Sequence, residues 1–329
     1  MAVPPGRGRT HEQPATSLLV TQALRNRGAL ACVPWLAILA GMESQTLEGP
    51  GPRVSVIIPS RDGYRDGCVP RLMASVEAQR FRDYEVHLIE GISPQGKAIN
   101  QGADRARGEI FVILDDDSRL ADDTVFERLV DALDADATVG MAGASIVVSP
   151  DATAFQQRAS RQFPRFNMPV VESVTDSDFA CHGCCAMRAE VFHEVGRERD
   201  DIIRGLDPDL RARIRNAGYR VVLAPHAHVY HPLPDGWGRL LRMFFRNGFG
   251  SAYARKFHPD SVYETHEEVD AAGYRATTSF AYRVARFPLR LLRALATGRF
   301  MRFAAYCSYA CGYCWGLLAA REESLEAGR

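Results

Sequence analysis

Three consecutive carboxylates, Asp115, Asp116 and Asp117, come directly after the apolar run Ile110–Leu114. An apolar run of this length is typical of a strand that is buried on both faces. Clustered carboxylate oxygens suit a hard cation such as Mg²⁺ or Mn²⁺, and open α/β sheets bind their ligands at the carboxyl ends of parallel strands. The pattern therefore predicts a divalent-metal site, and the alternative is a solvated acidic turn that caps the following helix.

A fourth carboxylate, Asp207, stands in the segment Leu206–Leu210, which opens a predicted helix. With Pro208 as the first helical residue, Asp207 is expected at the N-cap, where the helix dipole lowers its pKa and keeps it ionised. A rigid, ionised carboxylate that lies away from the metal is suited to take a proton from a reacting hydroxyl group. The alternative is that Asp207 serves only as a helix cap.

Strands and helices alternate along the part of the chain that contains these carboxylates. The alternation predicts an α/β fold, in which a mixed, mainly parallel sheet is flanked by helices on both faces. No regular pattern is found between residues 150 and 178, which are expected to cross over the sheet towards a second half. The expected strands are 54–59, 85–89, 110–114, 139–148, 186–188 and 219–223, and the expected helices are 69–78, 97–106, 123–133, 189–195 and 206–217.

Composition limits the classes of function. The formal net charge is zero, so no global field favours nucleic acid and no such partner is expected. Eight cysteines in 329 residues do not suggest a disulfide framework, which favours a reducing, cytoplasmic setting. Of the 40 lysine and arginine residues, only Lys97 and Lys256 are lysines. Residues 1–52 include a stretch rich in Pro, Gly, Arg and Thr, and they are expected to form a poorly ordered N-terminal extension.

From about Arg53 to Pro259 the chain resembles the family 2 glycosyltransferases, which have the GT-A fold. Each matching piece is short, and their order and spacing make the resemblance specific. The resemblance implies a nucleotide-sugar-binding half at residues 53–150 and an acceptor-binding half at 151–235, followed by a helical, basic and apolar region at 236–329. The pieces are the strand Val54–Pro59, the segments Ala98–Gly102 and Ala106–Glu109 that lead to Leu114–Asp117, the helix start Leu206–Leu210, and Ala217–Arg220 running on to His231.

The resemblance also implies a reaction, which is inverting transfer from a nucleoside-diphosphate sugar to a hydroxyl of a glycan or lipid-linked acceptor. Asp117 would bind a divalent metal, Mn²⁺ or Mg²⁺, together with Asp115 and His231. Asp207 would be the general base, and Asp209 is the reserve candidate because Leu206 stands where the family usually has glutamate. The residues implied to contact the nucleotide sugar are Pro59, Ser60, Arg61, Glu90, Lys97, Asn100, Asp115 and Asp116.

Two other functions stay open. Residues 91–98 follow a strand and nearly match a P-loop, which would make the chain an NTPase, although Ala98 stands where a P-loop needs Ser or Thr to hold Mg²⁺. A catalytically inactive GT-A scaffold that binds a sugar nucleotide or a partner would also fit the altered Leu206–Asp207 pair. The Gln-x-x-Arg-Trp motif of processive polysaccharide synthases is missing, so the resemblance favours non-processive transfer of one or a few sugars.

The C-terminal region is predicted to be helical and cationic. Arg239, Arg242 and Arg246 recur at helical spacing, and further arginines precede the uncharged run 303–320. That run is just long enough to span a bilayer. An interfacial helix pair on anionic lipid and a soluble helical lid are the alternatives. Membrane association, peripheral or through a C-terminal anchor at the cytoplasmic face, is favoured, and it would suit a lipid-linked acceptor in the synthesis of cell envelope polysaccharide.

Overall fold

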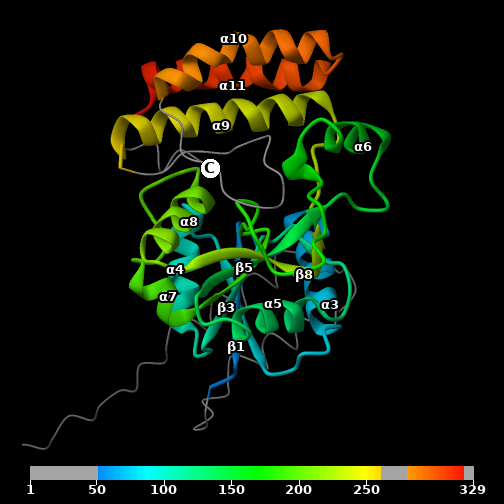
Figure 1. Ribbon diagram of the computed structural model, residues 1–329, viewed down its shortest axis with the longest axis vertical. Coiled ribbons are helices and arrows are strands. Elements are labelled where there is room, and N and C mark those ends of the chain that lie inside the picture. Colours follow the sequence, from blue (N-terminus) through cyan, green and yellow to red (C-terminus); the bar gives the residue numbers. More distant parts are fainter. Residues whose placement is uncertain (1–50, 261–279, 322–329) are drawn as a thin grey trace, which may run out of the picture. The chain divides into compact units, whose positions relative to one another are not determined.

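A mixed sheet forms the framework of the chain in the computed structural model, which describes residues 51–260 and 280–321 (Figure 1). The predicted N-terminal extension, 1–52, lies almost wholly outside these residues. Along the sheet the order is β2-β1-β3-β7-β5-β8-β4, and β6 pairs with β8. The strands are β1 Val54–Ser60, β2 Tyr84–Glu90, β3 Ile110–Leu114, β4 Arg119–Leu120, β5 Val139–Val147, β6 Thr175–Asp176, β7 Cys184–Arg188 and β8 Arg220–Tyr230.

The direction of the strands confirms the predicted mixed, mainly parallel sheet. Among the described strands, β1, β2, β3, β5 and β8 run one way, and β4, β6 and β7 run the other way. Strands that run the same way end at the same edge of the sheet, so the residues that follow β1, β2, β3 and β8 are gathered there. This edge carries the carboxylates that follow β3.

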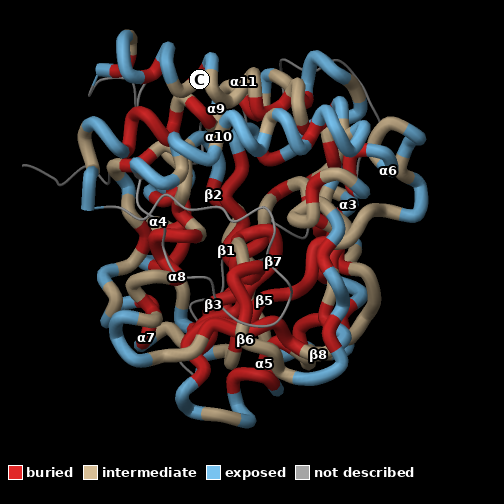
Figure 2. Tube along the Cα trace, turned by 45° about the horizontal axis from the view of Figure 1, so that its top comes forward, coloured by how far each residue is buried: buried red, intermediate tan, exposed pale blue. Residues whose placement is uncertain are grey.

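Helices cover both faces of the sheet, as the alternation of elements predicted. On one face Val54, Val56 and Ile58 of β1 pack in a core shared with α3 and α5, and on the other face Ile57 packs with α4, α7 and α8. The whole of β1 is buried, as is β3 (Figure 2). The helices are η1 Arg65–Gly67, α3 Cys68–Glu77, α4 Gln95–Arg105, α5 Val125–Asp134, α6 Ala154–Ser160, η2 Pro164–Phe166, α7 Ala189–Glu194, α8 Leu206–Asn216, α9 Trp237–Phe257, α10 Phe280–Ala296 and α11 Phe300–Ala319.

The segment between residues 150 and 178 differs from the expectation because it contains regular elements, α6, η2 and β6. Thr153 starts α6 with a capping box. The hydroxyl of Thr153 accepts a hydrogen bond from the Gln156 backbone N–H, and the Gln156 side chain accepts one from the Thr153 backbone N–H. A Thr-x-x-Gln spacing is a local signal of a helix start, so this helix could have been predicted from the sequence.

Strand β8 is longer than the predicted 219–223. Its pairing with β5 shifts register between Gly143 and Ser145, opposite a segment in which His226 has a φ of 57°. The irregularity accommodates Pro225, which has no backbone N–H to donate a hydrogen bond to the neighbouring strand. The pairing of β8 with β5 resumes after it. The strand therefore reaches Tyr230 and delivers His231 to the edge of the sheet.

The predicted C-terminal helical extension is present as α9, α10 and α11. Helices α9 (yellow in Figure 1) and α11 (red) lie side by side. Glycines allow this close approach, since an added Cβ at Gly248 would lie 2.0 Å from the carbonyl oxygen of Tyr309, and one at Gly312 would lie 2.0 Å from that of Phe245. Among the helices that the structure describes, none combines the length and the apolar character needed to cross a membrane.

Candidate active site

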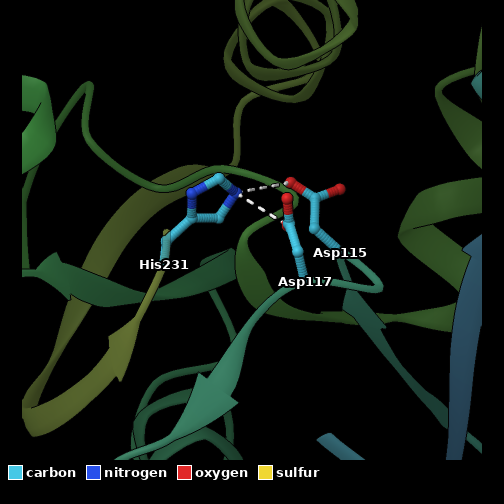
Figure 3. Close-up of side chains that lie close together, drawn as sticks. All are labelled: Asp115, Asp117 and His231. Carbon is cyan, nitrogen blue, oxygen red and sulfur yellow. Dashed lines mark ion pairs between the residues drawn. The ribbon is translucent and has the colours of Figure 1, made fainter. Parts of the chain in front are cut away.

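Asp115, Asp117 and His231 lie together at one edge of the sheet (Figure 3). The aspartates follow β3 and His231 follows β8, and these strands end at the same edge. His231 Nε2 lies 3.1 Å from Asp117 Oδ1 and 3.6 Å from Asp115 Oδ2. Asp117 Oδ1 is buried, and its one neighbour of opposite charge within reach among the described residues is the imidazole of His231. An imidazole and two carboxylates within this distance of one another fit a divalent cation, so the structure brings the three predicted metal ligands together.

Electrostatics at this cluster favour a positive charge between the two aspartates. Burial alone would lower the pKa of His231, but the carboxylates of Asp117 and Asp115 raise it to about 10. Burial acts in the opposite direction on Asp117, where His231 and Arg65 outweigh it and lower the pKa of the carboxyl group. The carboxylate of Asp117 is therefore ionised at neutral pH.

Arg65, which the sequence did not single out, approaches Asp117 and the neighbouring Asp116. Its guanidinium donates to Asp116 and Asp117 from the turn η1. Arg65 and Asp66 have φ values of 44° and 54°. This conformation is strained for residues other than glycine, and such strain is often found at functional sites. Asp116 is buried, and burial raises its pKa despite the hydrogen bonds from Ser60 and Arg65. Asp116 therefore faces the loop after β1.

The residues implied to border the nucleotide base lie at the ends of β1 and β2. Pro59 and Ser60 are buried, whereas Arg61 is exposed. Ser60 is in register with Glu90 on the neighbouring strand. Glu90 packs closely over Gly63, where an added Cβ would lie 2.2 Å from Glu90 Oε1. The structure thus places these candidates on adjacent strand ends beside β3, and their contact with a nucleotide stays a prediction.

Two further candidates, Lys97 and Asn100, lie on α4. Lys97 is exposed. The amide of Asn100 is engaged by the main chain, because its Nδ2 donates to the carbonyl of Glu198 at 2.9 Å and its Oδ1 accepts from the N–H of Glu198 at 3.0 Å. Gln95, at the start of the same helix, was not predicted and donates from Nε2 to Asp115 Oδ1 at 2.8 Å. Of these three side chains, Gln95 is the one that contacts the acidic cluster.

Asp207 is the second residue of α8, so its prediction as the N-cap is wrong. The N-cap is Gly205 with a φ of 94°, a conformation that glycine adopts without strain and that starts the helix earlier. Asp207 Oδ1 accepts a hydrogen bond from the backbone N–H of His182 at 2.7 Å. Burial alone would raise the pKa of Asp207, but His182 and Arg211 lower it. The side chain is ionised and 35% exposed, which leaves it open to a hydroxyl group.

The reserve candidate, Asp209, has a different environment. Its side chain is only 4% exposed, and its Oδ2 accepts a hydrogen bond from Arg213 Nε at 2.8 Å, one turn along α8. A buried carboxylate paired with arginine suits a structural role. Between the two candidates, the exposure of Asp207 is better suited to contact with an acceptor than the buried, paired state of Asp209.

Two side chains that sequence reasoning missed extend inward from Asp207. His182 Nδ1 lies 3.1 Å from Asp207 Oδ1, and His182 Nε2 lies 2.7 Å from Glu198 Oε1. No periodicity connects these residues, because the loop between α7 and α8 brings Glu198 to the start of β7. Only the contacts of the folded chain identify them.

Comparison with protein families gives one match. Residues 57–196 match the family model described as Glycosyl transferase family 2. The match includes Asp115 and Asp117, and it ends before Asp207 and His231. The matched range also includes residues 91–98, so this comparison gives no support to the P-loop alternative. No curated protein sequence matches the chain.

Several solved structures resemble this chain at low sequence identity. The mannosyltransferase PcManGT from Pyrobaculum calidifontis, in complex with GDP-Man and Mn²⁺, is 17% identical, with a TM-score of 0.46 over 95% of this chain and 90% of that one. GalNAc-T7 with UDP, GalNAc and Mn²⁺ is 15% identical, with a TM-score of 0.45 over 66% of this chain and 53% of that one. TarS of S. aureus is 11% identical, with a TM-score of 0.42 over 59% of this chain and 39% of that one.

Proposed function

We propose that the chain, whose residues 57–196 match the family model described as Glycosyl transferase family 2, transfers a sugar from a nucleoside-diphosphate sugar to a hydroxyl of its acceptor, with inversion at the anomeric carbon. One observation carries the proposal. A cluster suited to a metal, Asp115, Asp117 and His231, and a separate ionised carboxylate, Asp207, lie on either side of His182. Transfer to a hydroxyl group needs both a cation that stabilises the departing diphosphate and a separate base that takes the proton of the hydroxyl.

The donor side comprises the cluster and the ends of β1 and β2. Asp115, Asp117 and His231 would hold Mn²⁺ or Mg²⁺, and such an ion neutralises the charge of a departing diphosphate. Arg65 adds a guanidinium that pairs with Asp117 of this cluster and with the neighbouring Asp116. The nucleotide would border Pro59–Arg61 and Glu90, where two strand ends leave exposed polar side chains.

The acceptor side depends on Asp207. Its carboxylate takes the proton of the acceptor hydroxyl as the hydroxyl oxygen attacks the anomeric carbon and the bond to the diphosphate breaks. A single displacement of this kind inverts the anomeric centre. The lowered pKa of Asp207 keeps the carboxylate ionised, and the hydrogen bond from the backbone of His182 fixes one of its oxygens, so the other oxygen is available to the hydroxyl.

The C-terminal helices support a proposal for the acceptor and the location. We name as the apolar face the exposed side chains Leu289, Leu292 and Leu295 of α10 together with Phe300, Trp315 and Leu318 of α11. Exposed apolar side chains on two helices that contact each other support an interaction surface, and the exposed Arg286 and Arg290 of α10 suit anionic headgroups. We therefore propose that this face lies on the cytoplasmic surface of an anionic membrane, where a lipid-linked acceptor, or a glycan carried there, receives one or a few sugars.

The test of the reaction combines nucleotide binding with turnover. UDP or GDP with Mn²⁺ is expected to raise the unfolding temperature of the wild-type chain, since a ligand that binds only the folded state stabilises it. Asp117→Asn is expected to abolish this shift. Asp123→Asn removes a surface carboxylate that pairs with Arg80, so it is the matched control and should keep the shift.

Turnover then separates an active enzyme from a scaffold. Wild-type chain with the matching nucleotide sugar and Mn²⁺ is expected to release nucleoside diphosphate and to form a glycoside of inverted configuration, measured by NMR of the anomeric proton. Stabilisation without turnover of any donor and acceptor tested would favour the inactive scaffold. Stabilisation by ATP alone would contradict the transferase altogether.

A further inference from the structure

A row of three ionisable side chains, Glu198, His182 and Asp207, ends at the proposed base. Glu198 Oε1 lies 2.7 Å from His182 Nε2, and His182 Nδ1 lies 3.1 Å from Asp207 Oδ1. The side chain of Glu198 is 0% exposed, that of His182 is 3% exposed, and that of Asp207 is 35% exposed. The row therefore runs from the interior to the surface where an acceptor hydroxyl would react.

The imidazole in the middle of the row lies between two carboxylates, with an oxygen of Asp207 near its Nδ1 and an oxygen of Glu198 near its Nε2. Only a protonated imidazole donates from both ring nitrogens, so this geometry fits a positively charged ring. Glu198 is a buried carboxylate whose Oε2 has no hydrogen-bond partner. Because a buried charge without compensation is costly, the imidazolium of His182 balances Glu198 on one side and Asp207 on the other.

We propose that His182 and Glu198 are positioning residues for the base of the transfer reaction. This inference rests on the proposed function, in which Asp207 takes the proton of the acceptor. His182 holds Asp207 Oδ1 twice, through its backbone N–H and through its ring Nδ1. Because Oδ1 is held in place, Oδ2 of Asp207 has a fixed orientation towards the acceptor hydroxyl. Glu198 in turn fixes the orientation of the imidazole ring through Nε2.

The main chain of His182 extends this role to the donor side. Its carbonyl oxygen accepts a hydrogen bond from the backbone N–H of Asp115 at 2.9 Å, while its N–H donates to Asp207. One residue thus sets the spacing between a proposed metal ligand and the proposed base. In a single displacement the attacking hydroxyl must lie in line with the departing diphosphate, and a small misplacement of the base reduces the rate strongly.

The inner end of the row is anchored on α4. The two hydrogen bonds between the Asn100 amide and the main chain of Glu198 hold the loop after α7 against this helix. Arg197, the residue before Glu198, also donates to the carbonyl of Asn100 at 2.6 Å. The sequence assigned Asn100 to the nucleotide, and its contacts support a different role as the support of this loop.

The experiment compares Glu198→Gln with the wild type in steady-state transfer. Glutamine keeps the size of the side chain and removes its charge. We expect kcat to fall about 10-fold to 100-fold, the range seen when a group that orients a reacting side chain is removed, while the KM for the donor changes less than about twofold. Glu194→Gln is the matched control, because Glu194 is an exposed carboxylate nearby that accepts a hydrogen bond from Tyr219, and it should keep the wild-type kcat.

A double-variant cycle separates positioning from general stability. If Glu198 acts through Asp207, then Glu198→Gln causes no further loss of kcat in the Asp207→Asn background. His182→Asn is the second variant, in case Glu198→Gln folds poorly, because asparagine can still donate to Asp207 but cannot reach Glu198. The kcat of His182→Asn is expected to be about 10-fold lower than that of the wild type.

The outcomes decide between the two proposals. A folded Glu198→Gln or His182→Asn with the wild-type kcat would overturn the positioning role and leave the transferase intact. A loss that falls on the donor KM, or that persists in the Asp207→Asn background, would also overturn it, because a purely structural role gives those results. A wild-type chain that turns over no donor would refute the transferase itself, and the positioning role would fall with it.

Discussion

Asp207 and Asp209 are two residues apart on α8 and have opposite environments. Asp207 is partly exposed and held by His182, whereas Asp209 is buried against Arg213. Asp207→Asn is therefore expected to lower kcat by about 10²-fold to 10⁴-fold, the usual contribution of a general base, and to leave the thermal shift with nucleotide and Mn²⁺ unchanged. Steady-state kinetics and thermal unfolding measure the two quantities.

The second aspartate serves as the comparison. Asp209→Asn removes a charged partner of Arg213 and is expected to lower the free energy of unfolding by about 1–3 kcal/mol with a smaller effect on kcat. A larger loss of kcat in Asp209→Asn than in Asp207→Asn would reverse the assignment.

The pH profile of kcat tests the ionisation state of Asp207. The lowered pKa of Asp207 means that its ionised form is lost only as the pH falls below its usual range near 4, so Asp207 gives no acid limb between pH 5 and 8.

The sequence could predict some residues of the site and not others, for a physical reason. Asp115 and Asp117 follow β3, whose end can be predicted from apolar periodicity. His231 follows β8, whose end could not be predicted in this way, and only the family resemblance singled it out. Arg65 and Glu198 reach the site from loops, and their positions depend on a turn with positive φ and on contacts distant in sequence. No local pattern encodes such contacts.

At the scale of elements, the same limit applies. Apolar periodicity predicted the long strands and helices to within a few residues, because burial on one or two faces controls their sequence. It missed β4 and β6, which are two residues long, and the far end of β8, where Pro225 breaks the pattern. The strand conformation of these parts depends on pairing with neighbouring strands and not on their own residue pattern.

The close packing of α9 and α11 gives a prediction of its own. Gly248→Ala is expected to destabilise the protein by about 1–3 kcal/mol, the cost of overpacking, because its Cβ would meet the backbone of Tyr309 at 2.0 Å. Gly238→Ala, on the same helix with nothing within 4 Å of an added Cβ, is expected to stabilise by up to about 1 kcal/mol. Thermal unfolding midpoints measure both, and equal shifts in the same direction would contradict the close approach.

At the scale of the whole molecule, a chain with zero formal net charge carries the exposed Arg286 and Arg290 on α10, the helix that contributes three leucines to the apolar face. Co-sedimentation with vesicles tests the membrane proposal. We expect the wild type to bind vesicles that contain anionic phosphatidylglycerol and to be released by salt. Arg290→Glu on α10 is expected to weaken binding more than about fivefold, since one basic residue near the surface contributes about 1 kcal/mol.

The matched control lies far along the chain from the apolar face. Arg105→Glu makes the same charge change at an exposed position at the end of α4, and it should bind as the wild type does. Leu292→Asp tests the apolar contribution and should reduce binding further. The wild type could instead fail to bind anionic vesicles and form dimers that Leu292→Asp dissociates, as measured by light scattering. In that case the apolar face is a contact between two copies of the chain.

Strand β8 has a practical consequence for anyone who expresses part of this chain. It pairs with β5, β4 and β6 and lies wholly beyond residue 196, where the family match ends. A recombinant fragment trimmed to the matched residues would leave the nine-residue β5 as a bare, apolar edge, which invites intermolecular strand pairing and inclusion bodies. Fragments intended for crystallisation or screening should therefore extend at least through His231.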